Sequence, residues 1–170
     1  MQSSDYHIVS SDKNLSDKLN KKAYAVMDGD TLYVNCRDYR YQGVSFGPGY
    51  VRGYRYDGNK ICIVNQKIGS GELVAAGAIG AVVPGIVAAA AVGAVGQELM
   101  LANKVCYLVD SEPDQKGKTK IKYINDKLMN EVLADNEALR SKYNAAGDKF
   151  TRQSAANVIQ TLAEAGLIKK

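Results

Sequence analysis

Hydrophobic and polar residues alternate in two pairs of short runs in the first part of the chain. The paired runs are residues 23–27 with 31–36, and residues 50–56 with 60–66. Asp28-Gly29-Asp30 joins the first pair, and Asp57-Gly58-Asn59 joins the second. Asp-Gly between alternating runs is a strong hairpin signal, because glycine readily adopts the positive φ that tight turns need. The pattern predicts two β-hairpins, with a glycine-rich loop over residues 43–49 between them.

A fifth apolar run, Lys104 to Asp110, is bounded by polar residues and predicts a fairly buried strand. In the run before it, Val64 falls off the phase set by Ile61 and Ile63. The charged residues 111–120 then predict a loop. Together these runs indicate an antiparallel meander of about five strands.

The remainder of the chain has helical periodicity. Ile124, Leu128 and Val132 recur every four residues. Each of three predicted helices follows a residue type that caps helix N-termini, namely Asn125, Asn136, and either Thr151 or Ser154. Gly166 lies where a left-handed C-terminal cap is expected. The apolar stripes of these helices must be buried, most simply against the sheet, which predicts an α+β fold.

The chain of 170 residues favours one domain. We expect residues 1–22 to be a polar lead-in or one short helix from Leu15 to Lys22. Residues 23–110 would form the β-meander with an apolar helical insertion at residues 72–101, and residues 111–170 a helical tail packed on the sheet.

The predicted insertion contains Leu73–Gly96, 24 residues without a charged or polar side chain. Nine are Ala, five are Gly and nine are large aliphatic residues. Small residues recur at every fourth position, at Gly77, Ala81, Gly85, Ala89 and Gly93. On a helix this spacing forms a smooth ridge that another backbone can approach closely.

The length of this segment permits a membrane span, because 24 helical residues extend about 36 Å and a bilayer core is about 30 Å thick. Pro84 lies near its middle and favours a kink or a break into a hairpin of two shorter helices. Three interpretations remain open: a buried helical hairpin in the domain or an oligomer, a membrane-inserting hairpin or kinked helix, and a disordered apolar tract. A segment this apolar needs cover from lipid, the sheet or a second copy.

Composition gives few indications of chemistry. The net charge of +4 gives no strong indication of nucleic-acid binding. His7 is the single histidine and there is no Cys-x-x-Cys, so we expect neither a metal site nor a catalytic triad, and no cofactor. Cys36, Cys62 and Cys106 lie in apolar runs, which predicts three buried thiols. The alternative is one disulfide between Cys36 and Cys62, with Cys106 free.

A second candidate surface combines arginine and tyrosine. It comprises Arg37, Arg40, Arg52, Arg55, Tyr54 and Tyr56. Basic and aromatic side chains on one face of a sheet bind phosphates and stack on planar groups, so this face could bind an anionic polymer, either a nucleic acid or a glycan. Cross-strand packing of arginine on tyrosine explains the same residues without a ligand. Carboxylates in the hairpin turns would support a hydrolase only if two of them met in one cleft.

Three segments carry a family resemblance: residues 24–43, residues 104–112, and residues 136–147, the last with Leu139 and Tyr143 in an L-x-x-x-Y pattern. Together they resemble small uncharacterised exported proteins of Bacteroidetes-type bacteria. The resemblance implies export to the cell envelope and no particular activity. The start, MQSSDYHIV, lacks the features of a signal peptide, so we expect a trimmed or mature start.

The leading hypothesis from the sequence is therefore a non-enzymatic cell-envelope protein. Its Gly/Ala hairpin would associate with a membrane or with copies of the chain in a homo-oligomer. The alternative is a soluble binding module that uses the Arg/Tyr face for an anionic polymer.

Overall fold

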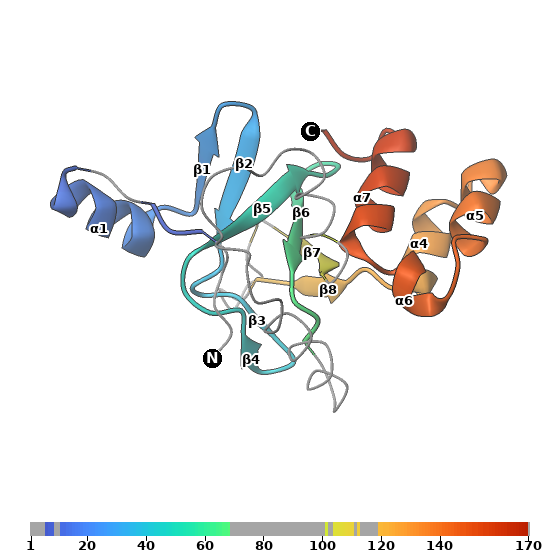
Figure 1. The fold of residues 1–170 in the computed structure, drawn as a ribbon, viewed down its shortest axis with the longest axis horizontal. Helices are drawn as coiled ribbons and strands as arrows, with labels where there is room; N and C mark the ends of the chain where they lie inside the picture. The colour runs from blue at the N-terminus through green and yellow to red at the C-terminus, as the bar shows by residue number, and fades with distance from the viewer. Residues whose placement is uncertain are drawn as a thin grey trace, which may run out of the picture.

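The computed structural model describes residues 6–8, 11–68, 101, 104–110, 112 and 119–169. Within these residues the chain forms an antiparallel sheet with the C-terminal helices on one side, an α+β fold as the sequence predicts (Figure 1). The strands are β1 (Ala25–Asp28), β2 (Thr31–Asn35), β3 (Arg40–Tyr41), β4 (Val44–Ser45), β5 (Tyr50–Arg55), β6 (Lys60–Asn65), β7 (Val105–Asp110) and β8 (Ile121–Tyr123). The helices are α1 (Lys13–Lys22), α4 (Asp126–Val132), α5 (Glu137–Asn144), α6 (Lys149–Arg152) and α7 (Ala155–Glu164).

The main sheet is a meander. Its six strands follow the order β1-β2-β5-β6-β7-β8, and every neighbouring pair is antiparallel. Both predicted hairpins are present. Gly29 and Gly58 occupy their turns with φ of 55° and 61°, the left-handed region that glycine adopts without strain.

Two pieces of β-structure are absent from the sequence-based prediction. β3 lies just before the predicted loop over residues 43–49 and β4 lies inside it. The two strands form a separate two-stranded sheet and are joined by Gln42 and Gly43, both with positive φ. β8 pairs with β7 through three residues and extends the sheet to six strands instead of about five. Strands of two or three residues are too short to display a period, so alternation alone does not reveal them.

The predicted helix starts agree with the structure. The side chains of Asn125 and Asn136 accept hydrogen bonds from the amides of Leu128 and Leu139. Ser154, not Thr151, caps the last helix. Thr151 instead lies inside the short α6, which the sequence did not predict and which Asp148 caps. Such caps satisfy amides that the first helical turn leaves without a partner.

The residues at the end of α7 return the chain to the sheet. Gly166 has φ of 70° and the amide of Leu167 donates to the carbonyl of Leu162, as the predicted C-terminal cap requires. This turn lets Ile168, which is buried, pack into the hydrophobic core and brings Lys169 alongside β5.

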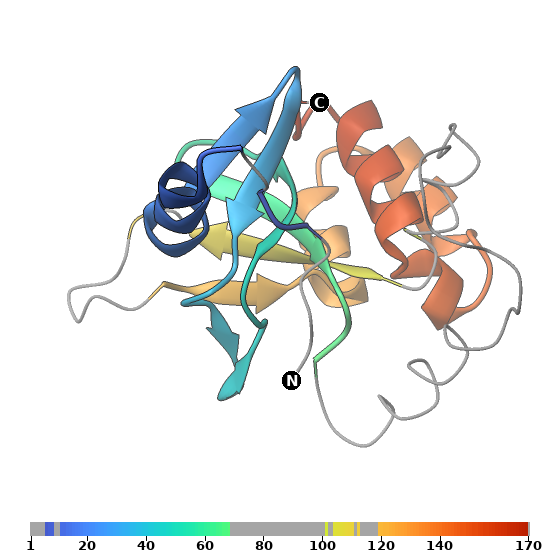
Figure 2. The ribbon, with the colours of Figure 1, turned by 60° about the vertical axis from the view of Figure 1, so that its left-hand side comes forward.

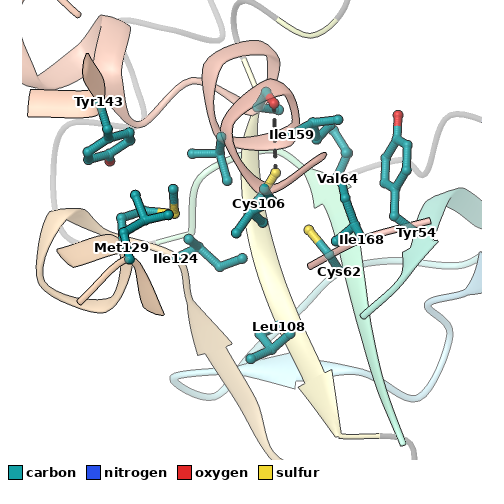
Figure 3. Close-up of a cluster of buried hydrophobic side chains, with 14 residues drawn as sticks. Tyr54, Cys62, Val64, Cys106, Leu108, Ile124, Met129, Tyr143, Ile159 and Ile168 are labelled. Carbon is teal, nitrogen blue, oxygen red and sulfur yellow. Dashed lines mark hydrogen bonds between the residues drawn. The ribbon is translucent and has the colours of Figure 1, made fainter. Parts of the chain in front are cut away.

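One hydrophobic cluster lies between the sheet and the helical layer. The sheet contributes residues such as Cys62, Val64 and Cys106, and the helices contribute others such as Met129 and Leu162. Figure 3 shows the thiols of Cys62 and Cys106 on this side of the sheet, with the Cys106 Sγ 4.0 Å from the carbonyl oxygen of Ala155. Close packing of these apolar side chains attaches α4, α5 and α7 to the strands.

A second cluster, called here the helix-free cluster, lies on the opposite face, and none of its described residues belongs to a helix. Val34, Phe46, Ile63 and Tyr107 are all fully buried in it. Ile63 and Val64 are therefore both buried, on opposite faces of β6. Hydrophobic and polar residues do not alternate regularly along β6 because both of its faces are buried and neither needs polar side chains.

All three cysteines are buried, as predicted, and no disulfide joins them. The alternative of a disulfide between Cys36 and Cys62 is wrong, because Cys36 packs in the helix-free cluster and Cys62 in the helical one.

The N-terminal lead-in forms the predicted short helix, α1, which buries none of its own residues. Hydrogen bonds tie the end of α1 to the sheet: Tyr50 Oη donates to the carbonyl of Leu19, and Asn35 Nδ2 donates to that of Asn20. None of the helices in the described part of the chain combines the length and the hydropathy needed to cross a bilayer.

Candidate functional site

The predicted Arg/Tyr residues are distributed over several parts of the fold. Tyr54 is buried in the helical cluster, and Tyr56 packs partly buried against it. Arg37 and Arg40 are exposed in the segment between β2 and β4, away from β5 in the chain. The structure therefore does not gather all six residues on one sheet face.

Arg52 and Arg55 lie on β5 with Tyr54 between them. Because strand side chains alternate, Arg52 shares a face with Tyr54, whereas Arg55 has the opposite parity. The Arg52 guanidinium carbon lies 5.3 Å from the centroid of the Tyr54 ring, a cation–π arrangement. Burial raises the pKa of Tyr54 to about 12, and the nearby charge of Arg52 only partly opposes this. Tyr54 is therefore a neutral hydroxyl at physiological pH.

These three residues line a cleft of about 260 Å³ together with Lys169 from the chain after α7. The cleft lies where the pairing of β2 with β5 ends. The last pair of these strands is Leu32 with Gly53. Two residues further along β5, the amide of Lys169 donates a hydrogen bond to the carbonyl of Arg55 at 3.1 Å. Figures 1 and 2 show the C-terminal end beside the tip of the β1–β2 hairpin. The cleft therefore lies between this hairpin and the C-terminal segment.

Gly53 forms part of the cleft lining, and the packing around it requires glycine. A Cβ atom at this position would lie 2.7 Å from Cγ2 of Val34 and 3.3 Å from Cγ2 of Ile61. The first contact is shorter than carbon atoms tolerate and the second is tight, which explains the glycine at the centre of an otherwise regular strand. The strand pattern Tyr50–Arg55 could not show this requirement.

A second candidate site is the root of the apolar insertion, defined here as residues 66–68 with residues 101 and 104. Asn65 of β6 pairs directly with Val105 of β7. The two strands that flank the insertion are therefore hydrogen-bonded neighbours, and the chain leaves and rejoins the sheet at one end of one hairpin.

The outgoing side of the root is bound to the helix-free face. Tyr107 Oη donates to the carbonyl of Gln66 at 3.0 Å and accepts from the amide of Ile68 at 2.7 Å. The Ile68 side chain is buried in the same cluster as the Tyr107 ring. One tyrosine thus holds the first residues after β6 by two hydrogen bonds and by apolar contact.

The returning side of the root is bound to the helical face. Leu101 packs against the helical cluster, and its carbonyl accepts from the amide of Lys104. The carbonyl of Lys104 in turn accepts a 2.7 Å hydrogen bond from the amide of Ala155 at the start of α7. The two sides of the root are therefore attached to opposite faces of the sheet.

The small-residue ridge itself lies outside the described residues. This applies to all five of its members, Gly77, Ala81, Gly85, Ala89 and Gly93, and to the predicted helical hairpin that contains them.

A charged network joins the helices. The Asp126 carboxylate accepts hydrogen bonds from Tyr143 Oη at 2.9 Å and from Arg152 Nη2 at 3.2 Å. Burial raises the pKa of Asp126, but hydrogen bonds from Arg152, Gln153 and Tyr143 outweigh it, so the pKa lies below its ordinary value of 3.8. These contacts connect α4, α5 and α6 and support the helical layer.

The turn carboxylates that the structure describes do not form a pair at the cleft, because Asp30 is the only acidic residue among the described residues of its lining. Among the described residues, no group of three or more His, Cys, Asp or Glu side chains is arranged to hold a metal ion.

A model of a protein family, described as a family of unknown function (DUF6563), matches residues 1–168. No curated protein and no solved structure matches the chain.

Proposed function

Because the chain belongs to this family of unknown function, for which no activity is described, we propose a function from the geometry of the insertion root. The protein is a non-enzymatic attachment protein of the cell envelope. Its sheet and helices form a body in water, and its apolar segment Leu73–Gly96 attaches this body to a membrane, where the small-residue ridge joins copies of the chain.

The observation that carries the proposal is the double attachment of the root. Tyr107 holds the outgoing side to one face of the sheet, and Lys104 joins the returning side to α7 on the other. The β6–β7 ladder continues up to Asn65 and Val105, so the two strands stay paired up to both ends of the insertion. A force that pulls on the segment would therefore act on both faces of the sheet.

The described surface does not gather its large apolar side chains in one element. The exposed ones are Tyr6, Leu15, Tyr24, Met27, Val44 and Phe150, which come from the N-terminal segment, the first hairpin, β4 and α6. Scattered apolar residues are usual on a soluble surface and do not form a platform for a long apolar segment. Lipid or a second copy is the cover that we propose.

The composition of the segment supports a membrane site shared between copies. Its nine large aliphatic residues supply about −0.3 to −0.6 kcal/mol each at the centre of a bilayer, a modest total for insertion. Close backbone contact along a small-residue ridge would add packing and interhelical contacts to this total. Export to the envelope rests on the resemblance to exported proteins and is part of the proposal.

The proposal is tested by flotation of the full chain with phosphatidylcholine/phosphatidylglycerol vesicles. We expect the wild-type chain to float with the vesicles and a variant with residues 73–96 replaced by a Gly/Ser linker to stay in the aqueous fraction. The linker variant should still fold, because lengthening or exchanging a surface loop changes the free energy of loop closure little. Circular dichroism verifies its folding.

Gly85→Leu/Gly93→Leu is the variant that separates membrane binding from self-association. It makes the segment more apolar but disrupts the ridge, so it should float and yet lose crosslinked oligomers in the vesicles. A wild-type chain that remains monomeric in buffer and does not float would contradict the proposal.

A further inference from the structure

We infer that the cleft between the β1–β2 hairpin, β5 and the C-terminal segment binds a small acidic sugar or a molecule of that chemistry, a carboxylate or phosphate on a polyhydroxylated ring. This site does not depend on the apolar insertion. Arg55 pairs with Ile61 at the start of β6, whereas the root of the insertion begins after Asn65 at its other end. The two sites are thus separated by about 13 Å along the strand.

The charge of the cleft selects an anion. Arg55 and Lys169 are exposed, and their backbones are joined by a hydrogen bond, so both cationic side chains start from neighbouring positions at the cleft. Arg52 adds a third positive charge, and its position is fixed over the ring of Tyr54. Against these three, Asp30 is the single acidic residue among the described residues of the lining. Cationic residues that line a concave surface raise the local concentration of anions.

The other residues of the cleft lining favour a ligand that carries hydroxyl groups and has a small apolar face. The carboxylate of Asp30 and the hydroxyl of Thr31 can accept hydrogen bonds, and the hydroxyl groups around a sugar ring can donate several at once, whereas inorganic phosphate near neutral pH has only one or two O–H donors. Met27 and Leu32 provide apolar wall against which the carbon-bound hydrogens of a ring can pack.

The size of the cleft limits the ligand to about one sugar unit. Its volume of about 260 Å³ lies just below the range of roughly 300–1,000 Å³ that is usual for drug-sized ligands. The ligand can be a free acidic sugar or the terminal unit of an acidic glycan, since both present the same group.

The full chain would be titrated with galacturonate, oligogalacturonate, glucose 6-phosphate, inorganic phosphate and glucose, followed by NMR of the backbone amides of residues 27–32 and 52–55. We expect saturable shifts with galacturonate or glucose 6-phosphate and at least about tenfold weaker binding of phosphate and glucose. Tighter binding of the oligomer than of the monomer assigns the site to the end of a glycan, and equal binding assigns it to the free sugar.

Arg55→Gln/Lys169→Gln removes two of the cations and should weaken the binding of the acidic sugar by about tenfold or more. The matched control, Arg37→Gln/Arg40→Gln, removes the same charge from exposed positions outside the cleft lining and should change affinity by less than about twofold. All four side chains are exposed, so both variants are expected to fold.

Asp30→Asn tests the sugar specificity. Removal of a negative charge should strengthen phosphate binding, while the preference for glucose 6-phosphate over phosphate decreases. Absence of saturable shifts with every acidic probe would overturn the inference. Equal weakening in the cleft and control variants would also overturn it, because it would assign the binding to net charge.

Discussion

The two faces of the sheet are buried by different means. Helices α4, α5 and α7 cover one face mainly with aliphatic side chains and capped helix starts. The β3–β4 sheet and the residues after β6 cover the other, where aromatic rings are prominent. Tyr107 lies at its centre, with the rings of Phe46 and Tyr41 at centroid distances of 4.9 Å and 5.3 Å.

The difference follows from the backbone of each cover. A helix satisfies most of its own amides and carbonyls, so it can cover a sheet with purely apolar side chains. An irregular segment does not satisfy its own amides and carbonyls, so its backbone needs hydrogen-bond partners from other parts of the chain. Tyrosine meets both needs, because its ring is apolar and its hydroxyl bonds the backbone, as Tyr107 does for Gln66 and Ile68.

The largest effect is expected on the helix-free face, which none of the described helices covers. Phe46→Ala should lower the free energy of unfolding by about 3–5 kcal/mol, since it removes a fully buried ring that packs edge-to-face on Tyr107. Urea denaturation measures the loss. The matched control is Phe150→Ala, at a ring that is 60 % exposed, which should change stability by at most about 0.5 kcal/mol. Equal effects would show that the helix-free face is not a packed core.

Gly53→Ala tests how tightly the helix-free face is packed along β5. The added methyl group would meet Val34 Cγ2 at 2.7 Å, so we expect a loss of about 1–3 kcal/mol in the free energy of unfolding. Val34→Ala removes the opposing methyl groups. A double-mutant cycle should therefore give a favourable coupling between the two changes, and strictly additive losses would contradict the proposed clash.

Asp126→Asn tests the helical face by its electrostatics. The variant should lose about 1–3 kcal/mol at neutral pH, because the bonds from Arg152 and Tyr143 no longer reach a carboxylate. The folded-state pKa of Asp126 is lowered below 3.8, so its contribution is complete above that value and is lost as pH falls through the folded pKa. The difference between wild type and variant in urea denaturation should shrink below about pH 4. A pH-independent difference would contradict this account.

Tyr107→Phe should have the smallest effect on global stability and a specific effect on the root. Loss of the hydroxyl removes two hydrogen bonds and should cost about 0.5–1.5 kcal/mol. Hydrogen exchange at the Ile68 amide should accelerate. Tyr123→Phe, which removes a hydroxyl that bonds Gln153 instead, should leave Ile68 protected. Unchanged exchange at Ile68 in Tyr107→Phe would show that this tyrosine does not hold the root.

Much of the fold could be predicted from local signals in the sequence. Asp-Gly turns indicated both hairpins, and Asn125 and Asn136 indicated helix starts, because each depends on backbone chemistry within a few residues. β8 and the β3–β4 sheet were missed, since their strands are short and tertiary pairing alone defines them. The burial of both faces of β6 could not be predicted either, because it also depends on tertiary contacts.

The candidate sites were predicted only in part. Arg52, Arg55 and Tyr54 were singled out by composition, but the face expected for all six residues does not exist because Arg37 and Arg40 lie on another segment. Lys169 lies at the cleft because its backbone pairs with that of Arg55, which is far from it in the sequence, and no local pattern in the sequence indicates this pairing. The role of Tyr107 likewise depends on the hydrogen bonds of its hydroxyl. The apolar run Val105–Asp110, in which it lies, indicates a buried strand and gives no sign of these bonds.

Hydrogen–deuterium exchange of peptides from residues 73–96, with and without phosphatidylcholine/phosphatidylglycerol vesicles, tests the attachment function most directly. The account predicts rapid exchange in dilute buffer and strong protection when vesicles are present, with the peptides of β6 and β7 protected in both conditions. Identical exchange of residues 73–96 in the two conditions, in a chain whose sheet stays protected, would contradict it.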